Sequence, residues 1–407
     1  MDERSLTGGA LRPLLSYFCA FVLALLIVAP NIPYSIPLLV NSARWCYLVV
    51  VCGLLGVLVC QQKIHLSLKA LSIYLFFSCF FSQAPYLSFN AYILVVAALW
   101  LFVAFRECDF DIILKILEAA FWLEVILAIM QLAGMDTLLN FGSAIRTDDA
   151  GKIISVGLEQ LRIPVFFGTV MQYMRFASVL AVLTPFLVLR NKFYLALIVV
   201  VCAISQSSTF AMSLIAGCGT YFILSFKSLK NKLRVIIYTS LAVACYAVYD
   251  YGSFEGAIDP ANGGRLYSWS IIWITWFTDT AKTSSPFVGA FNWHWFLFGH
   301  GIDTFLPLFP VYKHDINPFP QAHNCWLQFL WEIGLIGFLL IGWYSVSLVK
   351  RLYSNKEHLL IAGLACIATD MFFAFPTRMT QTFFLIVAFL AFCEKKYIDK
   401  VARETNP

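Results

Sequence analysis

Long apolar runs follow one another along this chain, and several reach the ~20 residues that a helix needs to cross a bilayer. Hydrophobic residues occupy 60% of the 407 positions and charged residues only 13%, and the mean hydropathy is +0.79. A soluble domain of this length could not bury so much apolar surface. We therefore expect an all-α polytopic integral membrane protein, with the lipid bilayer as its main partner.

The runs predict about twelve membrane-spanning helices in a single membrane domain over residues 1–407. Their expected bounds are Leu14–Pro30, Arg44–Cys60, Lys69–Ser82, Leu87–Phe105, Ile112–Leu132, Val170–Leu189, Lys192–Ser205, Ser208–Phe226, Val235–Asp250, Asn324–Val349, His358–Phe375 and Thr380–Cys393. The breaks at 82–86 and 205–208 each separate two short runs. Because Asn31-Ile32-Pro33 follows the first run where a signal peptide would have a small-residue cleavage site, we interpret that run as an anchor.

Basic residues give the expected orientation. If the N-terminus lies in the cytoplasm, 19 of the 28 lysine and arginine residues fall on the cytoplasmic side, with dense clusters at Lys227–Arg234 and Lys350–Lys356. The positive-inside rule then favours both termini in the cytoplasm. Two long segments, residues 133–169 and 251–322, face the outside. The net charge of +5 reflects this asymmetry and indicates no nucleic-acid partner.

Cysteine and histidine spacing indicates no metal site. The 12 cysteines fall mostly inside expected spans and show no C-x-x-C spacing, so we interpret them as small packing residues. His294, His300, His314 and His323 share the second outer segment, but no pair has the i, i+4 helical spacing that zinc sites use. We expect no metal and no cofactor.

A His-Asn pair opens the tenth expected helix, directly after the second outer segment. Unpaired backbone N–H groups and the positive end of the helix dipole lie there, and they lower the pKa of a histidine. His323 is therefore expected to be neutral and able to accept a proton, with Asn324 beside it. The alternative is an interfacial histidine that only caps the helix.

The same helix carries Glu332, nine residues after the histidine. A carboxylate at that depth needs a partner or a polar cavity, so structural pairing and catalysis both stay open for it. Gly334 and Gly337 follow, and we expect them to allow close helix packing without a chemical role.

A second polar group precedes an aromatic helix in the same outer segment. Trp269, Trp273 and Trp276 have helical i, i+4, i+7 spacing, so residues 265–277 are expected to lie along the outer membrane surface. Arg265 leads this helix at the depth of a lipid diphosphate, which a guanidinium can grip with two hydrogen bonds. The alternative is that Arg265 only snorkels to the interface.

Two further arginines are candidate cations. Arg162 lies in the first outer segment, and Arg175 lies within the expected start of the sixth span. An arginine in a hydrocarbon run is costly unless it faces a polar cavity or snorkels, so either residue is a candidate ligand for an anionic substrate.

These motifs resemble a known family. The pattern H-N-x-x-L-x-x-x-x-E-x-G-x-x-G at 323–337 resembles the signature of the O-antigen ligase and polymerase superfamily. Gly264, Arg265 and Trp269 match a G-R-x-x-x-W element of that family, and residues 298–305 look like its G-x-G-x-x-x-F segment. In specific residues the resemblance covers about 262–338 and the Ser208-Thr209 junction, and in topology most of the chain.

The resemblance implies an inverting glycosyltransferase in the bacterial inner membrane. It would move a glycan from undecaprenyl diphosphate to a lipid A-core or related acceptor hydroxyl on the periplasmic face, without a metal. His323 would be the catalytic base, and Arg265 with Arg162 or Arg175 would hold the diphosphate. The implied substrate-binding residues are Arg265, Arg162, Arg175, Asn324, Trp269 and Glu332.

Other functions stay open. Many ligases of the superfamily have Ser-Arg-Gly between the seventh and eighth helices, whereas this chain reads Gln206-Ser207-Ser208-Thr209 there, as in repeat-unit polymerases that extend a growing glycan. Twelve helices also suit a transporter or flippase, although few spans carry a central charge. The D-x-D at Asp109–Asp111 falls in a short cytoplasmic loop and is interpreted as a solvated turn.

Overall fold

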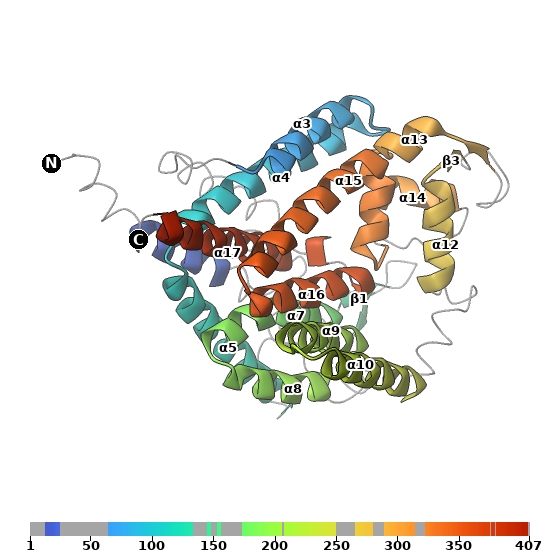
Figure 1. Cartoon of the computed structure of the whole chain (residues 1–407). Coiled ribbons are helices and arrows are strands. Elements are labelled where there is room, and N and C mark those ends of the chain that lie inside the picture. Colours follow the sequence, from blue (N-terminus) through green and yellow to red (C-terminus); the bar gives the residue numbers. More distant parts are fainter. Residues whose placement is uncertain are drawn as a thin grey trace.

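The computed structural model of the chain is mostly helical (Figure 1). It describes residues 13–24, 64–132, 145–147, 153–155, 173–205, 207–249, 265–279, 289–313, 322–374, 376–378 and 380–405. The helices are Pro13–Ala24, α3 (Leu66–Phe80), α4 (Pro85–Glu107), α5 (Phe110–Leu132), α7 (Tyr173–Arg190), α8 (Phe193–Ser205), α9 (Ser208–Ser225), α10 (Leu229–Tyr249), α12 (Arg265–Thr275), α13 (Trp293–Phe298), α14 (Phe305–Lys313), α15 (Cys325–Ser354), α16 (His358–Phe373), the 3₁₀ helix η3 (Pro376–Arg378) and α17 (Thr380–Thr405).

Three of the described helices, α4, α9 and α15, are long and apolar enough to cross a membrane. Shorter apolar helices, among them α3, α8 and α16, accompany them. This bears out the expectation of a mainly α-helical fold, and the long apolar helices suit a membrane, while the count of twelve spans stays a prediction. The breaks expected at 82–86 and 205–208 are present, and the expected span Arg44–Cys60 lies outside the described residues.

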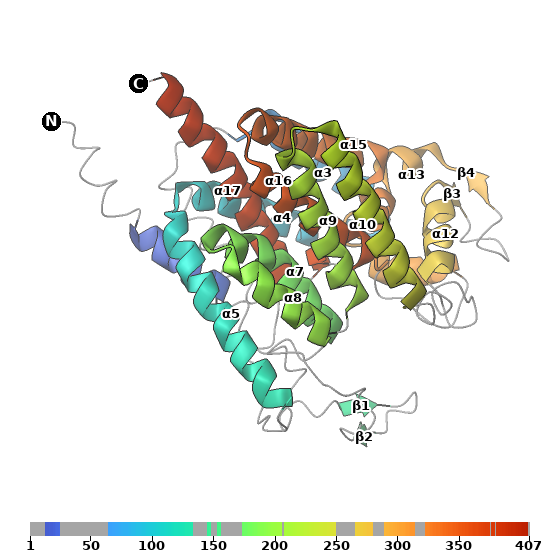
Figure 2. The ribbon, with the colours of Figure 1, turned by 60° about the horizontal axis from the view of Figure 1, so that its bottom comes forward.

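Two small antiparallel hairpins depart from an all-α fold. Strand β1 (Ile145–Thr147) pairs with β2 (Ile153–Ser155), and β3 (Thr278–Asp279) pairs with β4 (Ala290–Phe291). Both hairpins fall in the two segments expected outside the membrane. Figure 2 shows the first of them beyond the C-terminal end of α5.

Large apolar side chains lie both inside the bundle and on its surface. Phe105, Phe121, Phe186 and Phe389 are almost fully buried in one core between α4, α5, α7 and α17. On the outside, many large apolar residues of α3, α8 and α10 are exposed. A soluble monomer rarely exposes so much contiguous apolar surface, whereas a lipid-facing bundle does so of necessity.

One end of the bundle, called here the basic end, is tied together by ion pairs. Arg106 at the end of α4 and Arg351 near the end of α15 contact the two carboxylate oxygens of Glu394 on α17, at 3.1 and 3.2 Å. Arg190 at the end of α7 lies 3.1 Å from Asp111 at the start of α5. These contacts place the α4–α5 and α7–α8 turns and the C-terminal half of α15 at the same end.

The other end, called here the site end, consists of α12, α13, α14 and the start of α15. In Figure 1 these elements lie beside one another, on the side of the molecule away from the C-terminus. A second core fills this end and consists largely of aromatic residues, including Trp276, Trp295, Phe305 and Trp331. The site end is therefore a packed extension of the bundle, in which α12, α13 and α14 pack against the start of α15.

Candidate active site

Asn324 caps the N-terminus of α15 and directly follows His323 in the chain. Its side-chain Oδ1 accepts the backbone N–H of Leu327 at 3.0 Å, and the side chain is buried. The helix start expected from the sequence is thus confirmed, with Asn324 as its N-cap. His323 is half-buried and has a φ of +50°, a left-handed conformation that is uncommon outside glycine. Backbone outliers of this kind concentrate at functional sites.

Trp269 of α12 forms a hydrogen bond with Ala322, the residue directly before this histidine. Its indole Nε1 donates a hydrogen bond to the carbonyl of Ala322 at 2.8 Å. Its ring also meets Phe372 of α16 edge-on, with the ring centres 5.6 Å apart. Helix α12 therefore contacts both the segment that carries His323 and the last turn of α16.

The last turns of α16 lie along the first turn of α15. The indole of Trp326 donates to the carbonyl of Ala368 on α16 at 3.1 Å. Cys325 Sγ lies 3.0 Å from Thr377 Oγ1 of η3, which follows α16 in the chain. Through these contacts α12, the first turn of α15 and the end of α16 meet next to the backbone that carries His323.

Of the candidate arginines, Arg265 is the first residue of α12, one turn before Trp269. Arg175 lies in the first turn of α7. The side chains of both are outside the described residues, as is Arg162 altogether. The structure therefore brings the helix that begins with Arg265 to His323 and leaves the diphosphate clamp as a prediction.

A buried carboxyl group near this point was missed by sequence reasoning. Asp370 on α16 is fully buried and accepts a short hydrogen bond from the hydroxyl of Ser178 on α7. Its Oδ1 has no hydrogen-bond partner among the described residues. Ser178 lies three residues after Arg175, so this contact brings the N-terminal part of α7 against α16. The signal in the sequence was an acid within an otherwise apolar span.

Glu332 lies roughly 13 Å along α15 from the histidine, at 1.5 Å per residue. It is buried, and its Oε1 accepts the backbone N–H of Phe305 at 3.3 Å and the side-chain amide of Gln328 at 3.1 Å. These contacts hold the start of α14 against α15. Of the two roles left open for Glu332, the contacts correspond to structural pairing.

Helix α15 is broken at Gly334, where a continuous span was expected. Gly334 has φ +63° and ψ −174°, outside the helical region. The break frees three carbonyls, and each finds a donor: Trp331 O accepts from the N–H of His300 at 3.0 Å, Glu332 O from Gly301 at 2.9 Å, and Ile333 O from the Tyr74 hydroxyl at 2.6 Å. The segment after α13 and helix α3 thus supply the bonds that the broken helix lacks.

Glycines make this approach possible. A β-carbon on Gly299 would lie 2.4 Å from the backbone of Glu332, and one on Gly334 would lie 2.4 Å from the carbonyl oxygen of Leu297. Both residues have φ values near +70° with an extended ψ, a conformation that is essentially confined to glycine. Gly337 leaves room for the ring of Tyr74. The expectation that Gly337 allows close packing is confirmed, whereas Gly334 also breaks the helix, which the sequence did not predict.

His300 is fully buried and stacked on Trp331, with ring centres 3.9 Å apart. Its Nε2 lies 3.0 Å from the carbonyl oxygen of Thr275, and its Nδ1 lies 3.3 Å from Gln83 Oε1 in the α3–α4 turn. Burial lowers the pKa of His300 to about 3, so the imidazole is neutral. Since a carbonyl can only accept, Nε2 carries the proton.

With its proton on Nε2, His300 donates to the carbonyl of Thr275, and the lone pair of Nδ1 faces the acceptor oxygen of Gln83. Within the described ranges, no three His, Cys, Asp or Glu side chains gather so that they could hold a metal ion. The eight described cysteines are free thiols, and all but Cys218 are buried, as their interpretation as packing residues expects.

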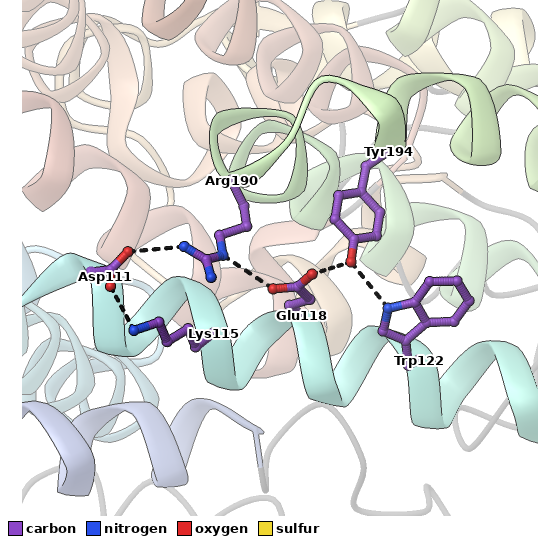
Figure 3. Close-up of polar contacts among 6 residues, drawn as sticks. All are labelled: Asp111, Lys115, Glu118, Trp122, Arg190 and Tyr194. Atoms are coloured by element: carbon purple, nitrogen blue, oxygen red, sulfur yellow. Dashed lines mark hydrogen bonds and ion pairs between the residues drawn. The ribbon is translucent and has the colours of Figure 1, made fainter.

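The D-x-D motif lies at the basic end, away from His323. Asp109 Oδ1 accepts the backbone N–H of Asp111 at 2.9 Å, which caps the start of α5. Asp111 pairs with Lys115 at 2.8 Å and with Arg190 at 3.1 Å (Figure 3). The two carboxylates of the D-x-D motif therefore stabilise the start of α5 and its contact with α7, and they do not belong to the candidate active site.

The fold defines a class only broadly: a mostly helical protein whose apolar helices suit a membrane, with a packed cap of short helices at one end. No protein-family model and no curated protein matches the chain.

Proposed function

We propose that the chain is an O-antigen ligase-type membrane glycosyltransferase that acts in lipopolysaccharide or surface polysaccharide synthesis. It transfers a glycan from undecaprenyl diphosphate to a hydroxyl of lipid A-core or a related acceptor. The observation that carries the proposal is the position of His323 directly before α15. The hydrogen bond from Trp269 of α12 to the carbonyl of Ala322 holds α12 next to this histidine. The three motif elements of the resemblance thereby belong to one packed region.

In the proposed reaction His323 takes the proton of the acceptor hydroxyl. The acceptor oxygen attacks the anomeric carbon, and the bond from that carbon to the diphosphate breaks with inversion. The diphosphate leaves with the electron pair, and Arg265 with Arg162 or Arg175 balances its charge. Because the donor already carries a good leaving group, the protein contributes chiefly a base, cations and alignment.

The basic end faces the cytoplasm in this proposal, and the site end faces the periplasm. The protein is then a multi-pass inner-membrane protein with both termini inside. Single cysteines at positions 230 and 282 test this orientation with an impermeant label: the outside reagent should reach position 282 only. Labelling of 230 but not 282 would reverse the topology and place His323 on the wrong side.

A repeat-unit polymerase of the same superfamily is the second candidate. The α8–α9 junction favours it, because Ser208-Thr209 stands there without the arginine that many ligases carry. The hydroxyl of Ser207 caps α9 by accepting the N–H of Phe210. Lipopolysaccharide from a deletion strain separates the two enzymes. Long chains that accumulate on the carrier indicate a ligase, and single repeat units on the core indicate a polymerase.

Reconstitution tests the enzyme against a transporter or flippase. Purified protein is mixed with undecaprenyl-diphosphate-linked glycan and a lipid A-core acceptor, and sugar transfer is measured with His323→Gln beside it. His294→Gln is the matched control, since His294 lies at the same end and is half-buried too. Its Nε2 lies 3.2 Å from the carbonyl oxygen of Phe81, and its ring packs against Phe298. Movement of the glycan across the bilayer without transfer would contradict the proposal.

A further inference from the structure

An apolar groove opens between α7, α8, α9 and α16 in the half of the bundle nearer the basic end. Its volume is about 140 Å³. Leu195, Leu214, Leu359 and Ala362 contribute to its walls. Along α9 the groove extends from Leu214 to Phe222, roughly 12 Å at 1.5 Å per residue.

The groove is built into the packing of these helices. Pro185 stands inside α7, where it cannot donate a backbone hydrogen bond, and Gly363 of α16 faces it: a β-carbon on Gly363 would lie 2.8 Å from Pro185 Cβ. Polar atoms of the walls are satisfied within the protein. Thr184 Oγ1 donates to the carbonyl of Leu180 at 2.7 Å, and Cys366 Sγ lies 3.5 Å from the carbonyl of Ala181. The interior therefore offers only apolar contacts.

One charged side chain lines the groove, at the turn between α7 and α8. Lys192, in the α7–α8 turn, lines it, is exposed and forms no ion pair with a described residue. Tyr221 also lines it near the end of α9. The neighbouring Arg190 is different, because its guanidinium is shared between Asp111 and Glu118 (Figure 3). An uncommitted ammonium beside an apolar slot suits a molecule with an anionic head and a hydrocarbon tail.

We infer that this groove binds one acyl chain of an anionic phospholipid from the leaflet at the basic end, with the lipid phosphate at Lys192. Charge complementarity selects the occupant. The slot is too small for a second helix, since a helix with its side chains is about 10 Å across. Because the surrounding lipid is as apolar as the groove, the acyl chain gains little binding free energy on entering it. The contact between the headgroup and Lys192 therefore determines which lipid is retained.

The test uses the whole protein in nanodiscs of equimolar dioleoyl phosphatidylglycerol and dioleoyl phosphatidylcholine, with retained lipids counted by native mass spectrometry. Because a lysine near an anionic membrane surface contributes about 1 kcal/mol, we expect the protein to retain phosphatidylglycerol about five-fold over phosphatidylcholine. Lys192→Gln should remove this preference. Lys230→Gln, an exposed lysine at the same end that does not line the groove, should leave it unchanged.

A second pair of variants tests the slot itself. Cys218→Phe places a ring in the groove and should lower the retention of both lipids, whereas Val199→Phe on the exposed face of α8 should not. Thermal unfolding in detergent shows whether each variant is folded. Equal losses for Lys192→Gln and Lys230→Gln would overturn the inference, because the basic end would then attract lipid as a whole. Unchanged retention by folded Cys218→Phe would overturn it too. So would native mass spectra in which the unmodified protein is a dimer and Cys218→Phe a monomer, because a second copy would then fill the groove.

Discussion

The two ends of the bundle are held together by different kinds of contact. At the basic end the links between helices are charged: Arg106 and Arg351 share Glu394, and Arg190 spans two carboxylates of α5. At the site end the links are hydrogen bonds and ring contacts, and several of the hydrogen bonds run through the backbone. The carbonyls freed at Gly334 accept from the segment after α13, and that segment carries the stacked imidazole.

This difference predicts different responses to mutation. A partly exposed ion pair contributes little, because solvent screens the charges and two long side chains lose freedom. A backbone contact made through two glycines tolerates no β-carbon at all. The site end should therefore be sensitive to shape and insensitive to salt. The partly exposed Arg190 pairs of the basic end should be the reverse, whereas the buried Arg106–Glu394 pair is screened little. We expect the chemistry at the site end, where Trp269 and Asn324 hold the backbone on either side of His323.

The largest expected effect is on catalysis at the site end. His323→Ala and His323→Gln should both abolish glycan transfer, because a general base typically contributes ~10²–10⁴-fold and an amide cannot take the proton. Activity should also fall on acidification, since a protonated imidazole cannot accept. The measurement is in vitro transfer from purified lipid-linked glycan, with carrier binding and thermal unfolding in parallel.

The stability of His323→Gln should match that of the unmodified protein, because the side chain is half-buried and Asn324 still caps the helix. Near-normal turnover of His323→Gln would mean that the residue only positions substrate. Loss of carrier binding along with turnover would assign it to the diphosphate site. In that case Asp370 is the next base to test, since it lies on the neighbouring α16 and Glu332 already pairs with Gln328.

The second effect concerns the cation at the start of α12. Arg265→Ala should lower transfer ten- to several-hundred-fold, since charge-assisted hydrogen bonds contribute about 1.5–3 kcal/mol each. Arg265→Lys should recover only part of it, because an ammonium meets one diphosphate oxygen where a guanidinium meets two. Full activity of Arg265→Ala at a normal protein level would show that this arginine only snorkels.

The third effect separates backbone shape from charge. Gly334→Ala should destabilise the protein by roughly 2–5 kcal/mol, because the new β-carbon would meet the carbonyl of Leu297 at 2.4 Å in a conformation that alanine avoids. Gly342→Ala is the control in the same helix, since a β-carbon there meets nothing within 4 Å. Thermal unfolding in detergent measures both. Equal stability for the two variants would remove the claimed role of the break.

Sequence reasoning found what local patterns determine. An asparagine before an apolar run predicted the start of α15, and the tryptophan spacing predicted a helix over 265–277, where α12 covers Arg265–Thr275. It missed what distant segments determine. Gly334 looks like a packing glycine until the segment after Leu297 is placed against it. The acid Asp370 gains its meaning from Ser178, 192 residues away in the chain.

The fourth effect is pH dependence at the site end. His300 has a folded-state pKa of about 3, below the ordinary value of 6.5, so only the unfolded chain takes up a proton between these values. The stability is therefore complete above pH 6.5 and declines as the pH falls. Between pH 7 and pH 5 the loss should be about 2 kcal/mol, at 1.36 kcal/mol per pH unit below the unfolded pKa.

His300→Gln provides the comparison for this profile. The variant should be less stable at pH 7, because it loses the stacking on Trp331, but its stability should decline less between pH 7 and pH 5. The midpoint of thermal unfolding across that range measures both changes. Parallel profiles for the two proteins would mean that other groups titrate, and that the buried imidazole does not set the acid sensitivity.

The smallest effect is expected at the basic end, in the network of Figure 3. There Arg190 lies 3.1 Å from Asp111 and 3.2 Å from Glu118, while Tyr194 of α8 shares the second carboxylate. The Arg190 side chain is 32% exposed and that of Asp111 55%, so solvent screens both pairs. Arg190→Ala should lower the unfolding midpoint by at most about 2 °C, and Lys115→Ala by less.

Salt then tests the comparison of the two ends directly. At 0.5 M NaCl the difference between Arg190→Ala and the unmodified protein should shrink, because exposed charges are screened, whereas the loss caused by Gly334→Ala should remain. A double-mutant cycle with Glu118→Gln isolates the pair itself. If Arg190→Ala cost as much as Gly334→Ala, or if salt reduced both losses alike, the ends would not differ in the way proposed. The ion pairs would then hold α5 against α7 as firmly as the glycine contacts hold α13 against α15.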